Sequence, residues 1–294
     1  MKKWLMLSRG PFLLLPIVLA FLGTCIAWYD GIFHLGHAIL AFFGLLLAHV
    51  SVNALNEYFD YKSGVDMETK RTPFSGGSGA LPLGLASLKQ ALWLGVGSLL
   101  VAVFIGIYFI FVSGWLLLPL LVVAAFCIVL YTPLILKTGW PEWAPGVGLG
   151  LLPVMGAYFV QTGAYNWPLF IASVPSGILV CNLLLLNEFP DVEADSKGGR
   201  RTLPIAIGMA KASIVYSVLT GLVYIWIIGA VIASVMPVFT LIALLTVPFA
   251  IKAIRGAMKY YDMQALVPGM ASNVMVVLIT QVLLGIGYIL AVVF

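Results

Sequence analysis

Long apolar stretches without charge dominate the chain. Six stretches of 20 or more residues contain no Asp, Glu, Lys or Arg: residues 10–29, 31–56, 90–136, 143–187, 212–251 and 263–294. A helix needs about 20 predominantly apolar residues to cross a membrane. The first two stretches and the last are therefore long enough for one crossing each, and the other three are long enough for two each. The pattern predicts an all-α, polytopic membrane protein with nine transmembrane helices in a single bundle.

Small and turn-forming residues predict where the longer stretches divide. Ser113-Gly114 separates the third and fourth helices, Thr162-Gly163 the fifth and sixth, and residues 234–237 the seventh and eighth. The fifth helix is rich in glycine and proline, which predicts close helix–helix approach and kinks. These residues are Pro145, Gly146, Gly148, Gly150, Pro153 and Gly156.

Composition and cysteine usage exclude several classes of protein. Only 9% of the residues are charged, whereas soluble domains have about 25%. The continuous apolar stretches also differ from the short alternating strands of a membrane β-barrel. Cys25, Cys127 and Cys181 lie in different predicted helices and have no paired spacing, which predicts buried free thiols. We expect membrane lipid around the bundle and no nucleic-acid partner.

The basic residues predict the orientation. With the N-terminus in the cytoplasm and nine crossings, all 15 Lys and Arg residues fall in cytoplasmic segments. Positive charge on the cytoplasmic side is the general rule for membrane proteins. The C-terminus is then expected on the outer side.

Carboxylates gather in two short windows at the cytoplasmic side. The windows hold eight of the eleven acidic residues: Glu57, Asp60, Asp66 and Glu68, and then Glu188, Asp191, Glu193 and Asp195. Both windows begin with an asparagine, because Asn56 precedes Asp60 by four residues and Asn187 precedes Asp191 by four. Four crossings separate the windows, so both lie on the same side and can face each other. Solvated loop charge is the alternative interpretation, but it does not explain this clustering.

Two facing carboxylate clusters predict a site for a divalent cation. Carboxylates that lie close together repel unless cations intervene, and Mg²⁺ is typically held by one or two carboxylates together with substrate phosphates. Basic residues that could bind phosphate flank both windows, although each could also serve only to set the topology: Lys62, Lys70 and Arg71, and Lys197, Arg200 and Arg201. The combination predicts a metal-bridged diphosphate site.

A polar stripe extends from the first window into the membrane. His49, Asn53, Asn56 and Asp60 lie on one face of a helix, and polar groups at membrane depth normally face a cavity or the bundle interior. Asn53 and Asn56 are therefore expected to line the same chamber as Asp60. For His49 two alternatives stay open, a hydrogen bond within the bundle and a contact with the substrate.

The doubled motif resembles the UbiA superfamily of intramembrane prenyltransferases over essentially the whole chain. The resemblance implies transfer of an isoprenoid chain from a prenyl diphosphate to a lipophilic, usually aromatic acceptor, with Mg²⁺ on the diphosphate. It implies Asp60, Asp66, Asp191 and Asp195 as metal ligands. Glu57 stands where many members have Asp, and Asp66 follows Asp60 by six residues instead of four.

The resemblance also implies roles for the other candidate residues. Tyr131 and Lys137 match a Tyr…Leu-Lys element whose lysine contacts diphosphate, and Arg9 matches an element near the acceptor. Asp60, Asp191, Asp195 and Tyr131 are expected to act in catalysis. The expected substrate-binding residues are Arg9, His49, Asn53, Asn56, Lys70, Arg71, Lys137, Asn187, Lys197 and Arg201.

Within the superfamily, two stretches look most like the menaquinone branch, which prenylates 1,4-dihydroxy-2-naphthoate. They are residues 189–204 and 71–79. The alternatives are 4-hydroxybenzoate or a glycerol-phosphate ether-lipid precursor as acceptor and, from another class, a secondary transporter. We expect one domain over residues 1–294, with helices 1–4 and 5–8 as a pseudo-repeat that helix 9 closes. The expected location is a bacterial or archaeal cell membrane, with the site facing the cytoplasm.

Overall fold

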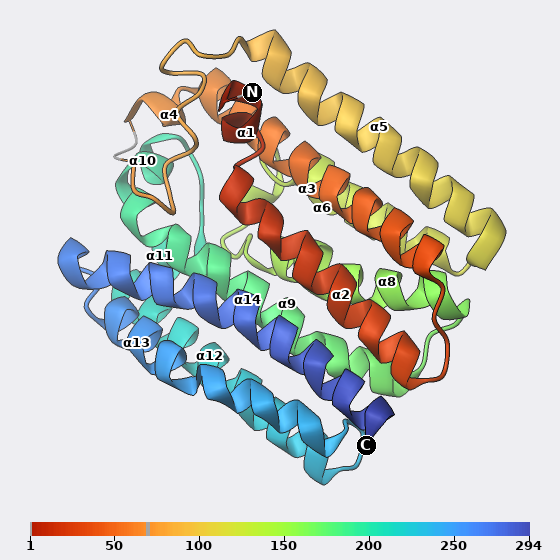
Figure 1. Cartoon of the computed structure of the whole chain (residues 1–294). Coiled ribbons are helices and arrows are strands. Elements are labelled where there is room, and N and C mark those ends of the chain that lie inside the picture. The colour runs from red at the N-terminus through yellow and green to blue at the C-terminus, as the bar shows by residue number, and fades with distance from the viewer. Residues whose placement is uncertain (1, 69–70) are drawn as a thin grey trace.

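The computed structural model describes residues 2–68 and 71–294, and within these residues all regular secondary structure is helical. Among these described residues, eight helical segments are long and apolar enough to cross a membrane. Figure 1 shows how they are arranged. In chain order they are Gly10–Tyr29 (η1 and α2), Leu35–Ser63 (α3), Leu88–Ser113 (α5), Trp143–Thr162 (α7, η3 and α8), Trp167–Lys197 (α9, η4 and α10), Met209–Ile232 (α12), Val238–Met258 (η5 and α13) and Met263–Val293 (α14).

The segment predicted as the fourth crossing is the short helix α6, Leu117–Leu130. Its 14 residues rise about 21 Å, which is less than the roughly 30 Å of a bilayer's hydrocarbon core. Pro133, which lies just beyond the helix, disfavours helical conformation in the residue before it and lacks an N–H donor. The structure therefore gives an all-helical bundle with eight candidate spans and one shorter apolar helix.

The predicted boundaries between neighbouring helices are confirmed. Helix α5 ends at Ser113, and Gly114 follows with a φ of 127°. Helix α8 (Leu152–Thr162) ends before Gly163, whose φ is 73°. A side chain is strained in this left-handed region, so glycine suits both turns. Helix α12 ends at Ile232, and η5 (Val238–Thr246) begins directly after Pro237.

The glycine-rich fifth helix contains a π-helical segment, η3 (Gly146–Leu151), between α7 (Trp143–Pro145) and α8. An ideal Cβ on Gly150 would lie 2.7 Å from the Ser176 carbonyl oxygen of α9 (Trp167–Asn187), and one on Gly146 would lie 2.9 Å from the Gly177 carbonyl oxygen. The glycines thus permit the close helix packing that the sequence predicts.

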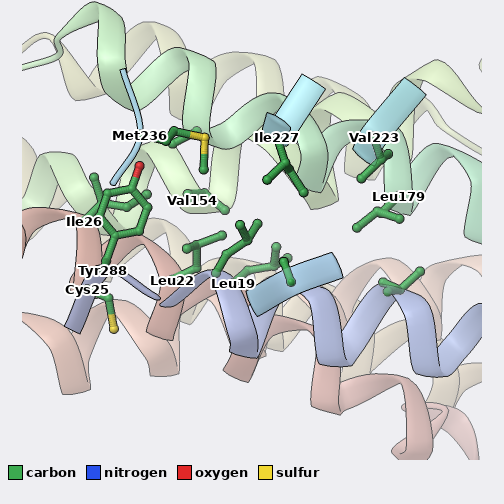
Figure 2. Close-up of a cluster of buried hydrophobic side chains, with 14 of the residues drawn as sticks. Leu19, Leu22, Cys25, Ile26, Val154, Leu179, Val223, Ile227, Met236 and Tyr288 are labelled. Atoms are coloured by element: carbon green, nitrogen blue, oxygen red, sulfur yellow. The ribbon is translucent and has the colours of Figure 1, made fainter. Parts of the chain in front are cut away.

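The main core joins α2 (Leu14–Tyr29) and α14 to α8, α9 and α12. Figure 2 shows Leu19, Leu22 and Ile26 of α2 in this cluster, together with Leu179 of α9 and Ile227 of α12. Their side chains are at most 3% exposed. This packing fixes α2 against α8 and α14, and α9 against the same two helices. Both α2 and α9 contribute residues to the candidate site.

Short helices gather at one end of the bundle. In Figure 1, α1 (Lys2–Leu7), α4 (Val65–Glu68) and α10 (Val192–Lys197) lie at the end nearest the N-terminus, and the C-terminus lies at the opposite end. Further short helices are η2 (Ile135–Lys137), η4 (Phe189–Asp191) and α11 (Leu203–Ile207). The three cysteines are buried and free, as predicted.

Candidate active site

A cavity of about 160 Å³ lies where the two acidic windows meet. Helix α3, the α9–α10 segment, and the segments around Arg9 and Tyr131 contribute to its wall. Ten of the residues predicted for the site line it: Arg9, His49, Asn53, Asn56, Asp60, Asp66, Tyr131, Asn187, Asp191 and Asp195. The structure therefore brings the first and second windows together around one chamber.

The polar stripe of α3 faces this chamber, as its spacing predicts. Asn53 donates from Nδ2 to the Ser8 carbonyl oxygen at 2.9 Å. Asn56 donates to Thr132 Oγ1 at 3.0 Å and accepts from Arg9 at 2.8 Å. These bonds tie α3 to the N-terminal segment and to the segment after α6.

Glu57 is completely buried and holds the segments around the chamber in place. Its carboxylate accepts from Arg9 Nε at 3.0 Å and from the Ser78 amide and hydroxyl, each at 2.7 Å. Burial opposes a charge on Arg9, but Glu57 and Asp60 outweigh this effect and raise its pKa. Glu57 thus acts as the common partner of Arg9 and of the loop after α4.

Arg200 joins the two acidic windows directly. Its guanidinium donates to Asp60 and, at 2.8 Å, to Asp195 Oδ1. Its side chain is 14% exposed, and those of Asp60 and Asp195 are 7% and 5% exposed. Burial opposes the charge on Arg200, but the two carboxylates outweigh it and raise its pKa. The guanidinium therefore neutralises charge at the centre of the site.

Glycines of the loop at residues 75–79 lie against both windows. The Gly76 amide donates to Asp191 Oδ2 at 3.0 Å. An ideal Cβ on Gly77 would lie 2.9 Å from Asp66 Oδ1, and the φ of Gly77 is 70°. Gly76 and Gly77 also line the cavity, so this loop forms part of its wall.

Several carboxyl and amide oxygens around the chamber have no hydrogen-bond partner among the described residues. They are Asp66 Oδ2, Asn187 Oδ1 and Asp191 Oδ1. Burial raises the pKa of Asp66 to about 7, and the carboxylates of Asp60 and Glu57 add to the shift. Buried oxygen atoms without donors have a strong capacity to accept a cation.

Tyr131 borders the chamber beside two further buried carboxyl groups. Burial raises the pKa of its phenol, and Glu188 and Glu142 add to the shift, so the phenol is neutral. Glu142 is completely buried and accepts from the Leu203 amide at 2.8 Å. The adjoining backbone is also paired, because Gly139 donates to Arg201 at 2.7 Å and Arg201 donates to Leu136 at 2.8 Å. These bonds fix the loop that carries Arg200.

Four of the predicted phosphate-binding cations do not line the cavity: Arg71, Lys137, Lys197 and Arg201. All four are exposed. The Arg71 guanidinium lies beside Gly79, and Lys197 forms a 3.0 Å ion pair with Glu193. Lys70, which was also predicted, lies outside the described residues.

The donor chemistry fits Mg²⁺ when substrate supplies further ligands. Among the residues that the structure describes, no three His, Cys, Asp or Glu side chains are placed to hold a metal ion by themselves. Mg²⁺, however, is usually held by one or two carboxylates, by waters and by substrate phosphates. The unpartnered oxygens of Asp66 and Asp191 are ligands of this kind.

The sequence as a whole decides the family. Residues 13–267 match the UbiA prenyltransferase family, and this match covers both acidic windows, Arg200 and most of the membrane helices. The chain belongs to this family. It is accordingly a prenyltransferase, and its resemblance to the superfamily is confirmed.

Individual relatives of this UbiA family member agree with the match. The chain is 29% identical to a 1,4-dihydroxy-2-naphthoate octaprenyltransferase of Bacillus subtilis over 85% of its length and 80% of the relative's. Its fold resembles that of a digeranylgeranylglyceryl phosphate synthase, with a TM-score of 0.68, 18% identity and 98% coverage of both chains. It also resembles a UbiA homologue from Archaeoglobus fulgidus bound to GPP and Mg²⁺, with a TM-score of 0.63, 15% identity and coverage of 99% of this chain and 100% of that one.

Sequence reasoning missed three contributors to the site of this UbiA family member. From the sequence, Arg200 was expected only to flank the second window, and substrate binding was assigned to its neighbour Arg201. The function of Glu57 as an anchor for Arg9 and Ser78 was not predicted. The buried position of Glu142 was not predicted, although its place at the edge of a 45-residue stretch without charge, residues 143–187, was a usable signal.

Proposed function

We propose that this UbiA family member catalyses the Mg²⁺-dependent transfer of a polyprenyl group from a prenyl diphosphate to 1,4-dihydroxy-2-naphthoate, a step of menaquinone biosynthesis. The observation that carries the proposal is the meeting of the two acidic windows at one cavity, where Arg200 contacts both Asp60 and Asp195. A diphosphate needs this combination of metal-binding carboxylates and buried positive charge.

In this proposal, Asp60, Asp66, Asp191 and Asp195 hold Mg²⁺. The A. fulgidus homologue carries Mg²⁺ together with GPP, which supports the assignment. When bound, the metal would neutralise negative charge on the departing diphosphate. The carboxamides of Asn56 and Asn187, which line the same cavity, would orient the substrate's oxygens.

Positively charged and N–H groups of the chain assist departure of the diphosphate in this proposal. Arg200 and Arg9 reach the cavity, and fixed charges aimed at developing negative charge lower the barrier without rearranging. The exposed cations Arg71, Lys137, Lys197 and Arg201, together with Lys70, are proposed contacts for the outer phosphate oxygens. A loop closure toward the diphosphate would bring them into reach.

The allylic cation that forms when the diphosphate leaves must be kept from water. The loop at residues 75–79 and the bundle enclose the chamber, and exclusion of water suppresses capture of a reactive intermediate. Tyr131 lines the cavity, and a neutral aromatic ring stabilises a nearby cation through its face. A carbon of the electron-rich acceptor ring would then form a bond to the cation, and loss of the naphthoate carboxylate as CO₂ would restore the aromatic ring. His49 and Asn53, deeper in the cavity, are the proposed contacts for the acceptor.

We propose nine crossings, with the N-terminus and the active site on the cytoplasmic side of a bacterial cell membrane. Helix α6 supports the ninth crossing, because it begins near α8, where Leu117 packs with Phe159, and ends at Tyr131 in the active-site cavity. Helices 1–4 and 5–8 of the predicted count would form the pseudo-repeat of a single domain, which α14 closes. Each half then contributes one acidic window.

The proposed acceptor is supported by the B. subtilis relative, which is named as a 1,4-dihydroxy-2-naphthoate octaprenyltransferase. The alternatives are 4-hydroxybenzoate and a glycerol-phosphate ether-lipid precursor. Purified protein in detergent, with Mg²⁺ and a labelled prenyl diphosphate, should prenylate the naphthoate with the highest kcat/KM among these three acceptors. A preference for another acceptor would leave prenyl transfer in place and overturn the acceptor assignment.

Variants of the acidic windows test the site. Asp60→Ala and Asp191→Ala should each lower Mg²⁺-dependent turnover by at least about 100-fold, because each removes fixed charge from the reacting centre. Asp262→Asn is the control, since Asp262 caps α14 and does not line the cavity, and Asn also caps helices. Full activity of both Ala variants would refute the assignment. Solute flux in proteoliposomes without prenyl transfer would favour the transporter.

A further inference from the structure

His49 is a buried polar side chain of α3 whose ring has one nitrogen without a hydrogen-bond partner. The residue is 3% exposed and lines the active-site cavity. Its Nδ1 lies 3.0 Å from the Leu45 carbonyl oxygen, whereas its Nε2 has no partner among the described residues. Leaving a buried polar atom without a partner costs free energy, which points to a group of a ligand beside it.

The Leu45 carbonyl determines which ring nitrogen of His49 carries the proton. A carbonyl oxygen can only accept a hydrogen bond, so Nδ1 is the donor. Among the described residues, no carboxylate lies within ion-pair distance of the ring, and a buried imidazole without such a partner stays neutral. Nε2 is therefore a hydrogen-bond acceptor, and the ligand group beside it must be a donor.

The position of His49 along α3 excludes the diphosphate as that group. His49 precedes Asp60 by eleven residues, which is about 16 Å along a helix axis. A diphosphate bound at Asp60 through a metal ion spans only part of this distance, and its ionised oxygens accept hydrogen bonds. The isoprenoid chain has no polar hydrogen atom. Of the two substrates, only the acceptor can then supply the donor.

One side of the active-site cavity suits a flat aromatic ring. Five apolar side chains that pack in one cluster line it: Phe12, Leu15, Leu149, Val180 and Leu183. Apolar walls that hold a ring, with a small number of polar groups that fix its orientation, are typical of sites for small molecules. A hydroxyl on the ring is the donor that such a ligand would offer to Nε2 of His49.

We propose that His49 Nε2 accepts a hydrogen bond from a ring hydroxyl of the acceptor, which makes His49 a specificity-determining residue. The inference rests on the proposed function, because that function supplies an acceptor with two hydroxyl groups. As the new carbon–carbon bond forms, positive charge spreads from the ring to the hydroxyl oxygen, so the hydroxyl becomes a stronger donor and keeps its proton. The bond to His49 is then strongest in the transition state and lowers the barrier.

Acceptor analogues that lack one hydroxyl test this bond in combination with His49→Leu. The analogues are 1-hydroxy-2-naphthoate and 4-hydroxy-2-naphthoate. His49→Leu should lower kcat/KM for the dihydroxy acceptor by at least about tenfold, because a hydrogen bond is lost. It should lower kcat/KM equally for the analogue that keeps the bonded hydroxyl, and it should not lower it for the other analogue. For an analogue that reacts too slowly, its inhibition constant replaces kcat/KM.

His37→Leu is the matched control. His37 also belongs to α3 but does not line the active-site cavity. Its Nδ1 lies 2.7 Å from the Val160 carbonyl oxygen, so the control loses the same kind of contact with the backbone as His49→Leu does. The ratios of kcat/KM among the three acceptors should therefore stay within about twofold of wild type, because no bond to the acceptor is lost.

Equal losses for all three acceptors in His49→Leu, or no loss for any, would overturn the role of His49 while leaving prenyl transfer intact. Failure of the wild-type protein to prenylate any acceptor would instead overturn the proposed function. Should His49→Leu fail to fold, NMR of wild-type protein with ¹⁵N-labelled histidine gives the answer. The Nε2 resonance of His49 should shift when the dihydroxy acceptor is added, and no shift with this acceptor would refute the proposal.

Discussion

Arg200 determines the electrostatic balance of the site. Several buried carboxylates face one chamber, and they would repel one another without a nearby cation. Arg200 contacts Asp60 of the first window and Asp195 of the second, so it holds the two windows together. The same guanidinium lines the cavity and can bind a diphosphate through several N–H donors.

Replacing Arg200 should therefore affect both stability and activity. Arg200→Gln leaves two buried carboxylates without their partner, and loss of one partner of a buried ion pair costs about 3–5 kcal/mol. We expect a lower unfolding temperature in detergent and a large loss of turnover. Arg201→Gln, at an exposed neighbour, should have the smaller effect on both. A larger loss for Arg201→Gln would contradict the assignment of Arg200 as the central cation.

Glu57 differs from the metal-binding carboxylates proposed above because its two oxygens are hydrogen-bonded to Arg9 and Ser78 of the protein itself. Its bonds to Arg9 and Ser78 would be weakened in Glu57→Gln, which removes the charge from a completely buried group. Loss of a charge-assisted hydrogen bond costs about 1.5–3 kcal/mol, so we expect that loss in the free energy of unfolding. Chemical denaturation measures it.

Glu193→Gln provides the comparison for Glu57→Gln. The Glu193 side chain is 82% exposed and pairs with Lys197 one helical turn away. Exposed pairs of this kind contribute about 0–1 kcal/mol, so the free energy of unfolding should change little. If both substitutions have the same small effect, Glu57 does not anchor the loop after α4.

The residue scale also shows a limit of prediction from sequence. The spacing of His49, Asn53, Asn56 and Asp60 was sufficient to place them on one face of α3, because helical periodicity is local. Local spacing cannot distinguish Arg200 from Arg201, since the answer depends on how the loop bends. That bend is set by backbone pairing of Arg201 with Leu136 and Gly139, which are more than 60 residues away in the chain.

At the scale of the element, the loop at residues 75–79 connects the two windows through its backbone. Gly76 donates to Asp191, Gly77 lies against Asp66, and Ser78 binds Glu57. The sequence indicated a flexible glycine-rich segment, but its contacts could not be predicted. They depend on the positions of Asp66 and Asp191 in three dimensions.

Gly77 and Gly84 separate backbone strain from a role in the site. Both glycines have a left-handed φ, 70° and 68°, but only at Gly77 would a Cβ approach a carboxylate, Asp66. Alanine at either position should lose about 1–2 kcal/mol of stability, the cost of a left-handed non-glycine residue. Only Gly77→Ala should also raise the KM for the prenyl diphosphate and weaken Mg²⁺ activation. Equal kinetics for the two variants would indicate that Gly77 serves only the turn.

At the scale of the whole molecule, the charge-free stretches predicted an all-helical membrane bundle, and eight of the nine predicted crossings have a helical segment long enough to span a membrane among the described residues. Stretches of apolar residues and turn signals such as Gly114 and Gly163 are sequence-local, so the helix boundaries agree with the structure. The short length of α6 and the π-helical segment at Gly146–Leu151 were not predicted. Both depend on packing against neighbouring helices, which hydrophobicity along one segment does not report.

The proposed orientation makes a prediction for labelling from outside the membrane. The three native cysteines are buried, so single introduced cysteines can report exposure to a membrane-impermeant maleimide in intact cells. Ala164→Cys lies in the loop between α8 and α9, and Tyr261→Cys and Thr138→Cys lie in loops at the end of the bundle that holds the active site. All three positions are exposed.

Only Ala164→Cys should be labelled in intact cells, because all 15 basic residues fall on the opposite side under the positive-inside rule. Tyr261→Cys and Thr138→Cys should react after permeabilisation. Thr138 is decisive for the short helix, since it follows α6 and lies on the cytoplasmic side only if that helix completes a crossing. Labelling of Thr138→Cys from outside would refute the ninth crossing. The reverse pattern at all three positions would indicate the opposite orientation, with the active site facing away from the cytoplasm.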